Sequence, residues 1–302
     1  MPAPLITPVP ASPSEPALPA GVLPLIMLGL GVGAVITAWV RDWIRPRSFR
    51  RLGVAPRFVD GVPRGGWWVA AAATFLGSYF VLAIVVISAN AMGMGPPAAA
   101  ATKVEASAFG VGVNAAAGGL TAVMVIVAAL WLAPRAAAWL RFSLSALGRG
   151  VLLSPLTFVA SGLMSVAVVA TLSLFGFTPP DARAHEMLIT LRDTRSPLLT
   201  GAIILLAVVL APVTEEFLFR ACLQTAFLQA TRRPWLAIIL TAALFAASHA
   251  TVVPVFMLPT LFITGVCLGI TLERRQNFWA CVGMHSGFNA LQLAAAMSGL
   301  LG

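Results

Sequence analysis

The stretch Glu215-Glu216-Phe217-Leu218-Phe219-Arg220 places two carboxylates and a guanidinium in a region of otherwise apolar sequence. An ionisable side chain at membrane depth is energetically costly, so it is interpreted as functional unless a simpler explanation exists. Three such residues within six positions indicate a functional site inside a membrane.

The composition on both sides of this stretch is that of a membrane protein. Of 302 residues, 59% are hydrophobic and 10% are charged, and the mean hydropathy is +0.94, values outside the range of soluble domains. The net charge of +9 could indicate nucleic-acid binding, but the basic residues fall in short clusters between apolar runs, as in loops that orient transmembrane helices. We therefore predict an all-α, multi-pass integral membrane protein of a bacterial-type cell membrane, with the lipid bilayer as a partner and no nucleic acid.

A count of about 20 apolar residues for one crossing predicts about eight transmembrane helices, with a catalytic core in the last four. The fifth would be about 50 Å long as one helix, so Pro212 is expected to kink or break it. The expected spans are 20–40, 67–89, 110–133, 151–177, 198–230, 235–252, 255–272 and 278–300.

Basic residues predict the orientation of these spans. Since loops rich in Lys and Arg stay in the cytoplasm, both termini are expected on the non-cytoplasmic side. Because no Lys or Arg precedes Arg41, the run 20–40 is expected to be a retained anchor and not a cleaved signal. The basic loops are 41–66, 134–150, 231–234 and 273–277.

The chain is expected to divide into three parts. Residues 1–19 contain seven prolines and a single charge, a composition typical of a disordered tail. Residues 20–197 would form the N-terminal transmembrane helices and a polar loop, and residues 198–302 the core that contains the motif. Within the second part, segment 178–197 fits an amphipathic surface helix or a solvated loop equally well.

Ionisable residues inside the predicted spans are few and lie in the last third of the chain. Of ten Asp and Glu residues, only Glu215 and Glu216 fall inside spans, and the others are placed in the tail, in loops or at span ends. Of three histidines, His249 and His285 lie within apolar runs. With Arg220, these residues make up the predicted set of buried ionisable groups.

The spacing of these residues predicts their geometry. Glu215 precedes the basic turn 232–233 by 17 positions and His249 follows it by 16, so an antiparallel helix pair brings them to the same depth, about 25 Å from the turn. Glu216 and Arg220 are four residues apart and can form an ion pair on one helix face. Glu215 points about 100° away, toward the histidines.

These residue types suit hydrolysis by an activated water. Glu215 can act as a general base while His249 orients the same water. His285 and Asn289, again four residues apart, can donate hydrogen bonds to a developing oxyanion. Phe245 shares that spacing with His249 and can form a packing wall. A structural interpretation also exists, in which the Glu–Arg pair joins helices and each histidine is an interhelical donor.

At this point the residues resemble those of a known family, the CPBP intramembrane proteases, which include the type II CAAX prenyl endopeptidase and the bacterial Abi-type proteins. The resemblance covers residues 198–302 and implies an α-helical endopeptidase that hydrolyses peptide bonds of membrane-associated or lipidated proteins. Three motifs carry it, and they are Glu215-Glu216-x-x-x-Arg220, Phe245-x-x-x-His249 and His285-x-x-x-Asn289.

The resemblance also implies roles for the residues. Glu215 and His249 would activate the water. His285 and Asn289 would bind the oxyanion, and Arg220 would steady the glutamate motif. The family is commonly labelled as metallo-endopeptidases, and two histidines with one or two glutamates could bind zinc. Since the chain lacks the HExxH arrangement and its motifs lie on three spans, the spacing requires no metal, and both mechanisms stay open.

Two other classes of function stay open as well. Glu and His within spans also form proton relays, so a proton-coupled transporter is an alternative, and it predicts pH-dependent flux in proteoliposomes. Asn289 beside His285 suits an oxyanion better than a relay. The third class is a non-catalytic binding or immunity protein that holds a peptide partner, and it predicts a phenotype that survives Glu215→Gln.

Overall fold

The structure, a computed structural model, describes residues 65–94, 103–136, 138–177, 191 and 196–297. All regular structure within these ranges is helical, which confirms the all-α prediction. Among the described residues, five helices are long and apolar enough to cross a membrane, so the chain is a multi-pass integral membrane protein. These helices are Gly66–Ala91, Phe109–Ala128, Leu144–Leu174, Pro197–Thr231 and Val255–Arg275.

Some predictions fall on residues that the structure does not describe. The tail at 1–19, the first span at 20–40 and almost all of the polar segment 178–197 lie outside the described residues. The total of eight spans and the three-part division therefore stay predictions.

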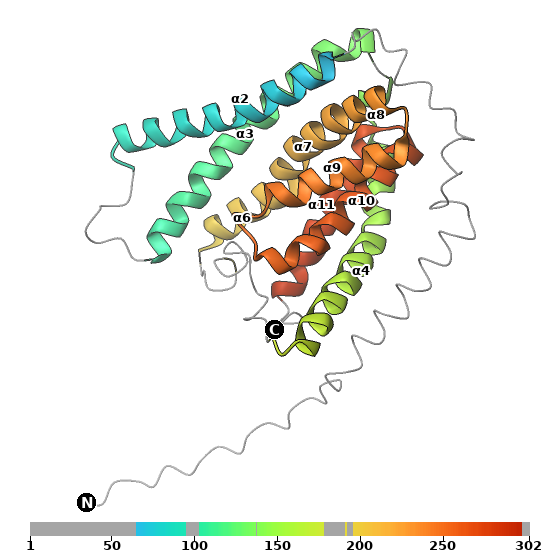
Figure 1. The fold of residues 1–302 in the computed structure, drawn as a ribbon. Coiled ribbons are helices and arrows are strands. Elements are labelled where there is room, and N and C mark those ends of the chain that lie inside the picture. The colour runs from blue at the N-terminus through green and yellow to red at the C-terminus, as the bar shows by residue number, and fades with distance from the viewer. Residues whose placement is uncertain (1–64, 95–102, 137, 178–190, 192–195, 298–302) are drawn as a thin grey trace, which may run out of the picture.

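Two N-terminal helices cover one side of the bundle (Figure 1). α2 (Gly66–Ala91) and α3 (Lys103–Ala136) pack against each other, and α2 also contacts the motif-bearing segment η4 (Phe217–Gln224). The inner face of α2 buries Trp67, whereas its outer face exposes large apolar residues such as Phe80. Such an outer face is suited to contact with lipid.

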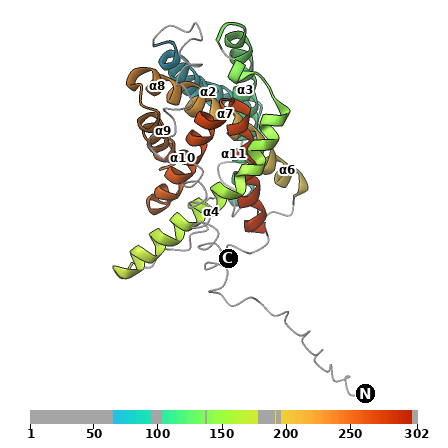
Figure 2. The same ribbon diagram turned by 90° about the vertical axis from the view of Figure 1, so that its right-hand side faces the viewer.

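The helix α4 (Leu144–Leu174) lies on the opposite side of the bundle (Figures 1 and 2). It packs along α11 (Phe278–Met297) and also contacts α10 (Leu258–Arg275). Since α11 carries the third motif, the close contact between α4 and α11 fixes the position of that motif.

Glycines allow α4 and α11 to approach each other closely. A Cβ on Gly150 would overlap the carbonyl oxygen of Ala280, and a Cβ on Gly283 would overlap that of Leu147. Because a backbone would have to shift, Gly150→Ala is expected to lower the free energy of unfolding by about 1–3 kcal/mol, seen as a lower melting temperature in detergent. Gly148→Ala, in the same helix with open space around its Cβ, is the control and is expected to keep full stability. Equal losses in the two variants would contradict this explanation.

The glutamate motif lies on one long helical segment between α3 and α9 (Figure 1). The helix does not end at Pro212, which lies in the first turn of α7, directly after a π-helical turn. The chain changes its helical register there, and π-helical turns of this kind are frequent at functional sites. The parts in order are α6 (Pro197–Leu205), η3 (Leu206–Leu210), α7 (Ala211–Glu216), η4 (Phe217–Gln224) and α8 (Thr225–Thr231).

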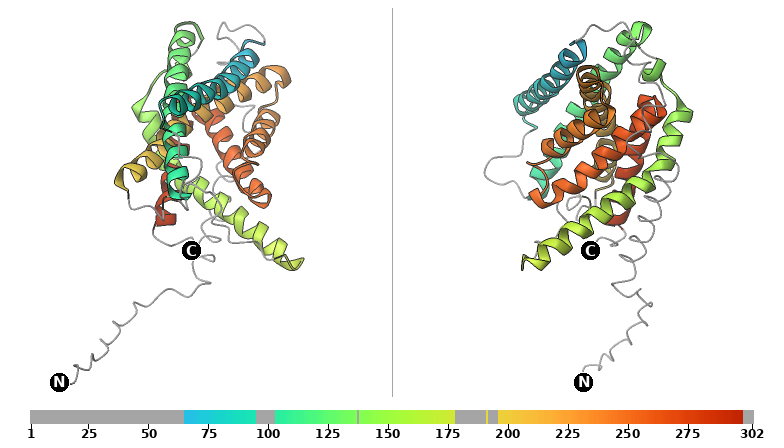
Figure 3. Two further views of the ribbon diagram at one scale, coloured as in Figure 1. Left: turned by 90° about the vertical axis from the view of Figure 1, so that its left-hand side faces the viewer. Right: turned by 45° about the vertical axis from the view of Figure 1, so that its right-hand side comes forward.

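The remaining helices surround the motif segment from the other side (Figure 3). α9 (Pro234–Ser248) follows a turn in which Arg232 has a left-handed φ of 56°. It packs on α10, and α9, α10 and α11 all contact η4. With 15 residues, α9 is about 22 Å long, and it ends four residues earlier than the expected span 235–252.

Candidate active site

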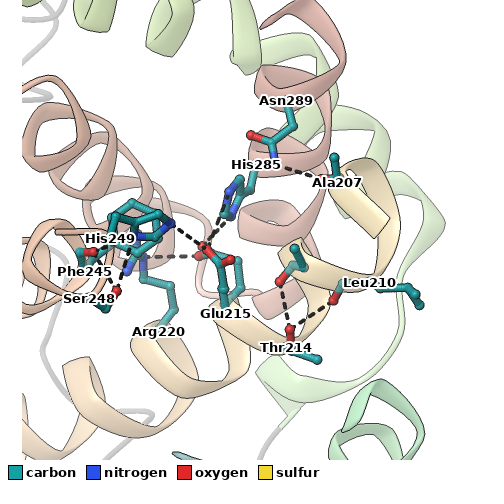
Figure 4. A network of polar contacts seen from close by, with 12 residues as sticks. Ala207, Leu210, Thr214, Glu215, Arg220, Phe245, Ser248, His249, His285 and Asn289 are labelled. Carbon is teal, nitrogen blue, oxygen red and sulfur yellow. Dashed lines mark hydrogen bonds and ion pairs between the residues drawn. The ribbon is translucent and has the colours of Figure 1, made fainter. Parts of the chain in front are cut away.

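The three motifs meet inside the bundle (Figure 4). Glu215 and Glu216 are the last residues of α7, and His249 directly follows the last residue of α9. His285 and Asn289 lie about one turn apart on α11. The helices thus bring together residues that are up to 74 positions apart in the sequence, from 215 to 289.

Glu216 is the centre of a buried polar network. Its Oε1 lies 2.9 Å from Nδ1 of His285, and its Oε2 lies 3.2 Å from Nε of Arg220. The side chains of Glu216 and Arg220 are fully buried, and that of His285 is 5% exposed. The ion pair predicted from the i, i+4 spacing is confirmed. The carboxylate also binds the imidazole of His285 at Nδ1 and leaves its Nε2 to face Glu215.

Phe245 packs against the charged and imidazole groups of the site. The guanidinium of Arg220 lies 5.0 Å from the centroid of the Phe245 ring, close enough for a cation–π contact. The same ring contacts the imidazoles of His249 at 4.8 Å and His285 at 5.9 Å, measured between centroids. The prediction that Phe245 forms a packing wall is confirmed, since its ring limits the positions of both histidines.

Glu215 is the less buried of the two carboxylates, and its Oε2 is a buried oxygen that has no hydrogen-bond partner among the described residues. Its side chain is 28% exposed and that of His249 is 21% exposed. Its Oε2 lies 3.9 Å from Nε2 of His249 and 3.9 Å from Nε2 of His285, which is too long for a direct hydrogen bond but suitable for a bridging water. Nδ1 of His249 is engaged by the carbonyl oxygen of Phe245 at 2.8 Å. Oε2 of Glu215 and the Nε2 atoms of His249 and His285 therefore face the same space.

Asn289 is held by the backbone of another helical segment. Its Nδ2 donates a hydrogen bond to the carbonyl oxygen of Ala207, in η3, at 2.7 Å. Asn289 itself is only partly buried. An amide nitrogen has two N–H groups, so the bond to Ala207 leaves one of them for another acceptor.

A second buried polar pair was not expected from the sequence. Glu273, expected in a loop or at a span end, lies near the end of α10 and is 6% exposed, so the predicted set of buried ionisable groups was incomplete. Its Oε1 accepts a hydrogen bond from Nε2 of the fully buried Gln224 at 2.9 Å. The signal that could have found this pair is the continuation of the i, i+4 series from Glu216 through Arg220 to Gln224.

Two histidines and a glutamate are also residue types that could bind a metal ion. Among the described residues, no group of three or more His, Cys, Asp or Glu side chains is arranged to hold an ion. One of the two candidate carboxylates, Glu216, is already bound by Arg220 and His285. The chemistry that this donor set supports is acid–base catalysis assisted by hydrogen-bond donors.

The comparisons with known proteins agree with this geometry. Residues 197–291 match the family model described as type II CAAX prenyl endopeptidase Rce1-like, and the match contains all three motifs. No curated protein and no solved structure matches the chain.

Proposed function

We propose that this chain is a CAAX-type intramembrane endopeptidase, a proposal supported by the family match over residues 197–291, and that Glu215 and His249 activate the water that hydrolyses its substrates. Those substrates are membrane-associated or lipidated proteins. One observation carries the proposal: the side chains of Glu215 and His249 are partly exposed and Oε2 of Glu215 lacks a hydrogen-bond partner among the described residues, whereas the Glu216–His285 pair is buried. Groups that react must be accessible, and the groups that orient them must be fixed.

Glu215 is the general base in this mechanism. Its Oε2 takes a proton from a water held between it and Nε2 of His249. The oxygen of that water forms a bond to the carbonyl carbon of the scissile peptide, and the carbonyl oxygen takes up the negative charge. The proton then passes from Glu215 to the peptide nitrogen as the C–N bond breaks, which releases a carboxylic acid and an amine.

His285 and Asn289 stabilise the tetrahedral intermediate. The imidazole of His285, held by Glu216 at Nδ1, donates to the oxyanion from Nε2. Asn289 supplies the N–H that is not used by Ala207. In known enzymes, one oxyanion donor contributes about 10²- to 10³-fold to kcat, so this pair accounts for a large share of the rate.

The test compares the peptide ends in membranes of cells that produce either the intact protein or Glu215→Gln. New ends that depend on the intact protein would support proteolysis and identify the substrates. If both proteins are present at equal levels and no ends differ, the proposal fails, and the transporter and the binding protein become the leading alternatives.

Removal of metal ions separates the acid–base mechanism from a zinc mechanism. We expect the purified protein to keep its full rate of cleavage after dialysis against a strong zinc chelator, because the donor set assigned to the reaction needs no ion. Protein dialysed against plain buffer is the control, and elemental analysis verifies the depletion. Loss of activity that is restored by added Zn²⁺ would contradict this expectation.

A further inference from the structure

The carbonyl oxygen that holds Asn289 is one that a helix ordinarily uses for itself. In an α-helix the carbonyl of residue i accepts from residue i+4, and in a π-helix from residue i+5. The α-type donor to Ala207 is Ala211, but the N–H of Ala211 bonds to Leu206 instead. The π-type donor would be residue 212, which is a proline and has no N–H. Neither of these regular donors is therefore available to Ala207.

This carbonyl oxygen needs a partner because it is buried. Ala207 is 5% exposed, and a buried acceptor without a partner costs about 1–3 kcal/mol. The amide of Asn289 supplies the hydrogen bond at 2.7 Å. Pro212 is itself buried, in the first turn of α7 and three positions before Glu215.

We propose that Pro212 is a positioning residue for Asn289. By withholding a backbone N–H, it keeps the Ala207 oxygen free to bind the amide of Asn289, and that bond directs the second N–H of the amide to the substrate. This inference rests on the proposed function, in which Asn289 binds the oxyanion. It gives a chemical reason for a proline inside a membrane helix beside the general base.

Pro212→Ala tests the proposal because it restores the missing N–H. If the segment keeps its π-helical register, the new N–H of residue 212 donates to the carbonyl oxygen of Ala207. If it changes to α-helical register, the N–H of Ala211 donates to that oxygen. In both cases the backbone displaces the amide of Asn289. We expect kcat to fall about 10- to 100-fold with little change in KM, less than the full loss of an oxyanion donor. The melting temperature should be unchanged or higher, since proline is the least favourable residue inside a helix.

Pro155→Ala is the matched control. It makes the same exchange inside α4, at an exposed position, and kcat is expected to stay unchanged. A purely structural role for Pro212 predicts loss of stability or an unchanged kcat, and either result overturns the proposal. In an Asn289→Ala background, Pro212→Ala should lower kcat no further, and additive losses would contradict a shared mechanism.

A readout that needs no substrate tests the same bond. The chain contains four asparagines, at 90, 114, 277 and 289, so their ¹⁵N-labelled side-chain amides can be resolved and Asn289 assigned from Asn289→Ala. We expect the amide protons of Asn289 to exchange faster in Pro212→Ala than in the intact protein. Equal exchange would overturn the inference. If Glu215→Gln cleaves normally, the proposed function fails while this measurement still decides the role of Pro212.

Discussion

Replacing Glu215 by glutamine is expected to lower kcat by about 10²- to 10⁴-fold, the range that a positioned general base contributes. Glutamine keeps the shape of the side chain but cannot take a proton from water. The side chain is partly exposed, and its contacts with His249 and His285 are both at 3.9 Å, so membrane insertion and melting temperature should not change. Cleavage of a quenched fluorescent peptide by purified protein in liposomes measures the rate.

Glu273→Gln provides the matched control for this experiment. It makes the same exchange at a buried carboxylate of the same bundle, and the new amide oxygen can still accept from Gln224. We expect it to keep kcat near that of the intact protein. Full activity of Glu215→Gln would remove Glu215 from the mechanism, and equal losses in both variants would assign the effect to folding.

Breaking the ion pair of Glu216 and Arg220 is expected to have the largest effect on stability. Both side chains are fully buried, with Nε and Oε2 3.2 Å apart. Glu216→Ala would leave the guanidinium buried without its counter-ion, and Arg220→Ala would do the same to the carboxylate. Each change is expected to cost about 3–5 kcal/mol. Thermal denaturation in detergent, with recovery from membranes as a second measure, tests this expectation.

The double variant Glu216→Leu with Arg220→Met separates stability from catalysis. Replacement of a buried ion pair by apolar groups of similar volume is often neutral for stability, so the melting temperature should recover. Cleavage should not recover, because His285 loses the carboxylate that binds its Nδ1. If the melting temperature and the rate of cleavage both recover, the ion pair serves only to join the helices, and its proposed role in orienting His285 is wrong.

The sequence was sufficient to predict most of the architecture and the main contacts of the site. The expected span 67–89 corresponds to Gly66–Ala91, because the hydrocarbon thickness sets the length of an apolar run. Helical spacing predicted the ion pair between Glu216 and Arg220. The nearly equal numbers of residues that separate Glu215 and His249 from the turn between their helices predicted that these two side chains would meet. These features depend on the local periodicity of helices.

Other features depend on tertiary contacts and leave little trace in the sequence. Glu273 is next to two arginines at the end of a span, a pattern typical of a loop, yet its partner Gln224 comes from a different helix. The change of register before Pro212 and the bond from Asn289 to Ala207 involve backbone groups. Almost every residue has a backbone carbonyl, so composition and spacing could not indicate that the one at Ala207 would accept from Asn289.

The short length of α9 has a consequence for how the site is hydrated. At about 22 Å, α9 is shorter than a hydrocarbon layer of about 30 Å. After His249 the chain continues in turns, and Ala250, Thr251 and Val252 are exposed. Irregular backbone at membrane depth is stable only where protein covers it or where it lines an aqueous cavity. Because these turns directly follow His249 and are exposed, we expect water to contact them, and the reaction would then draw its water from this end of α9.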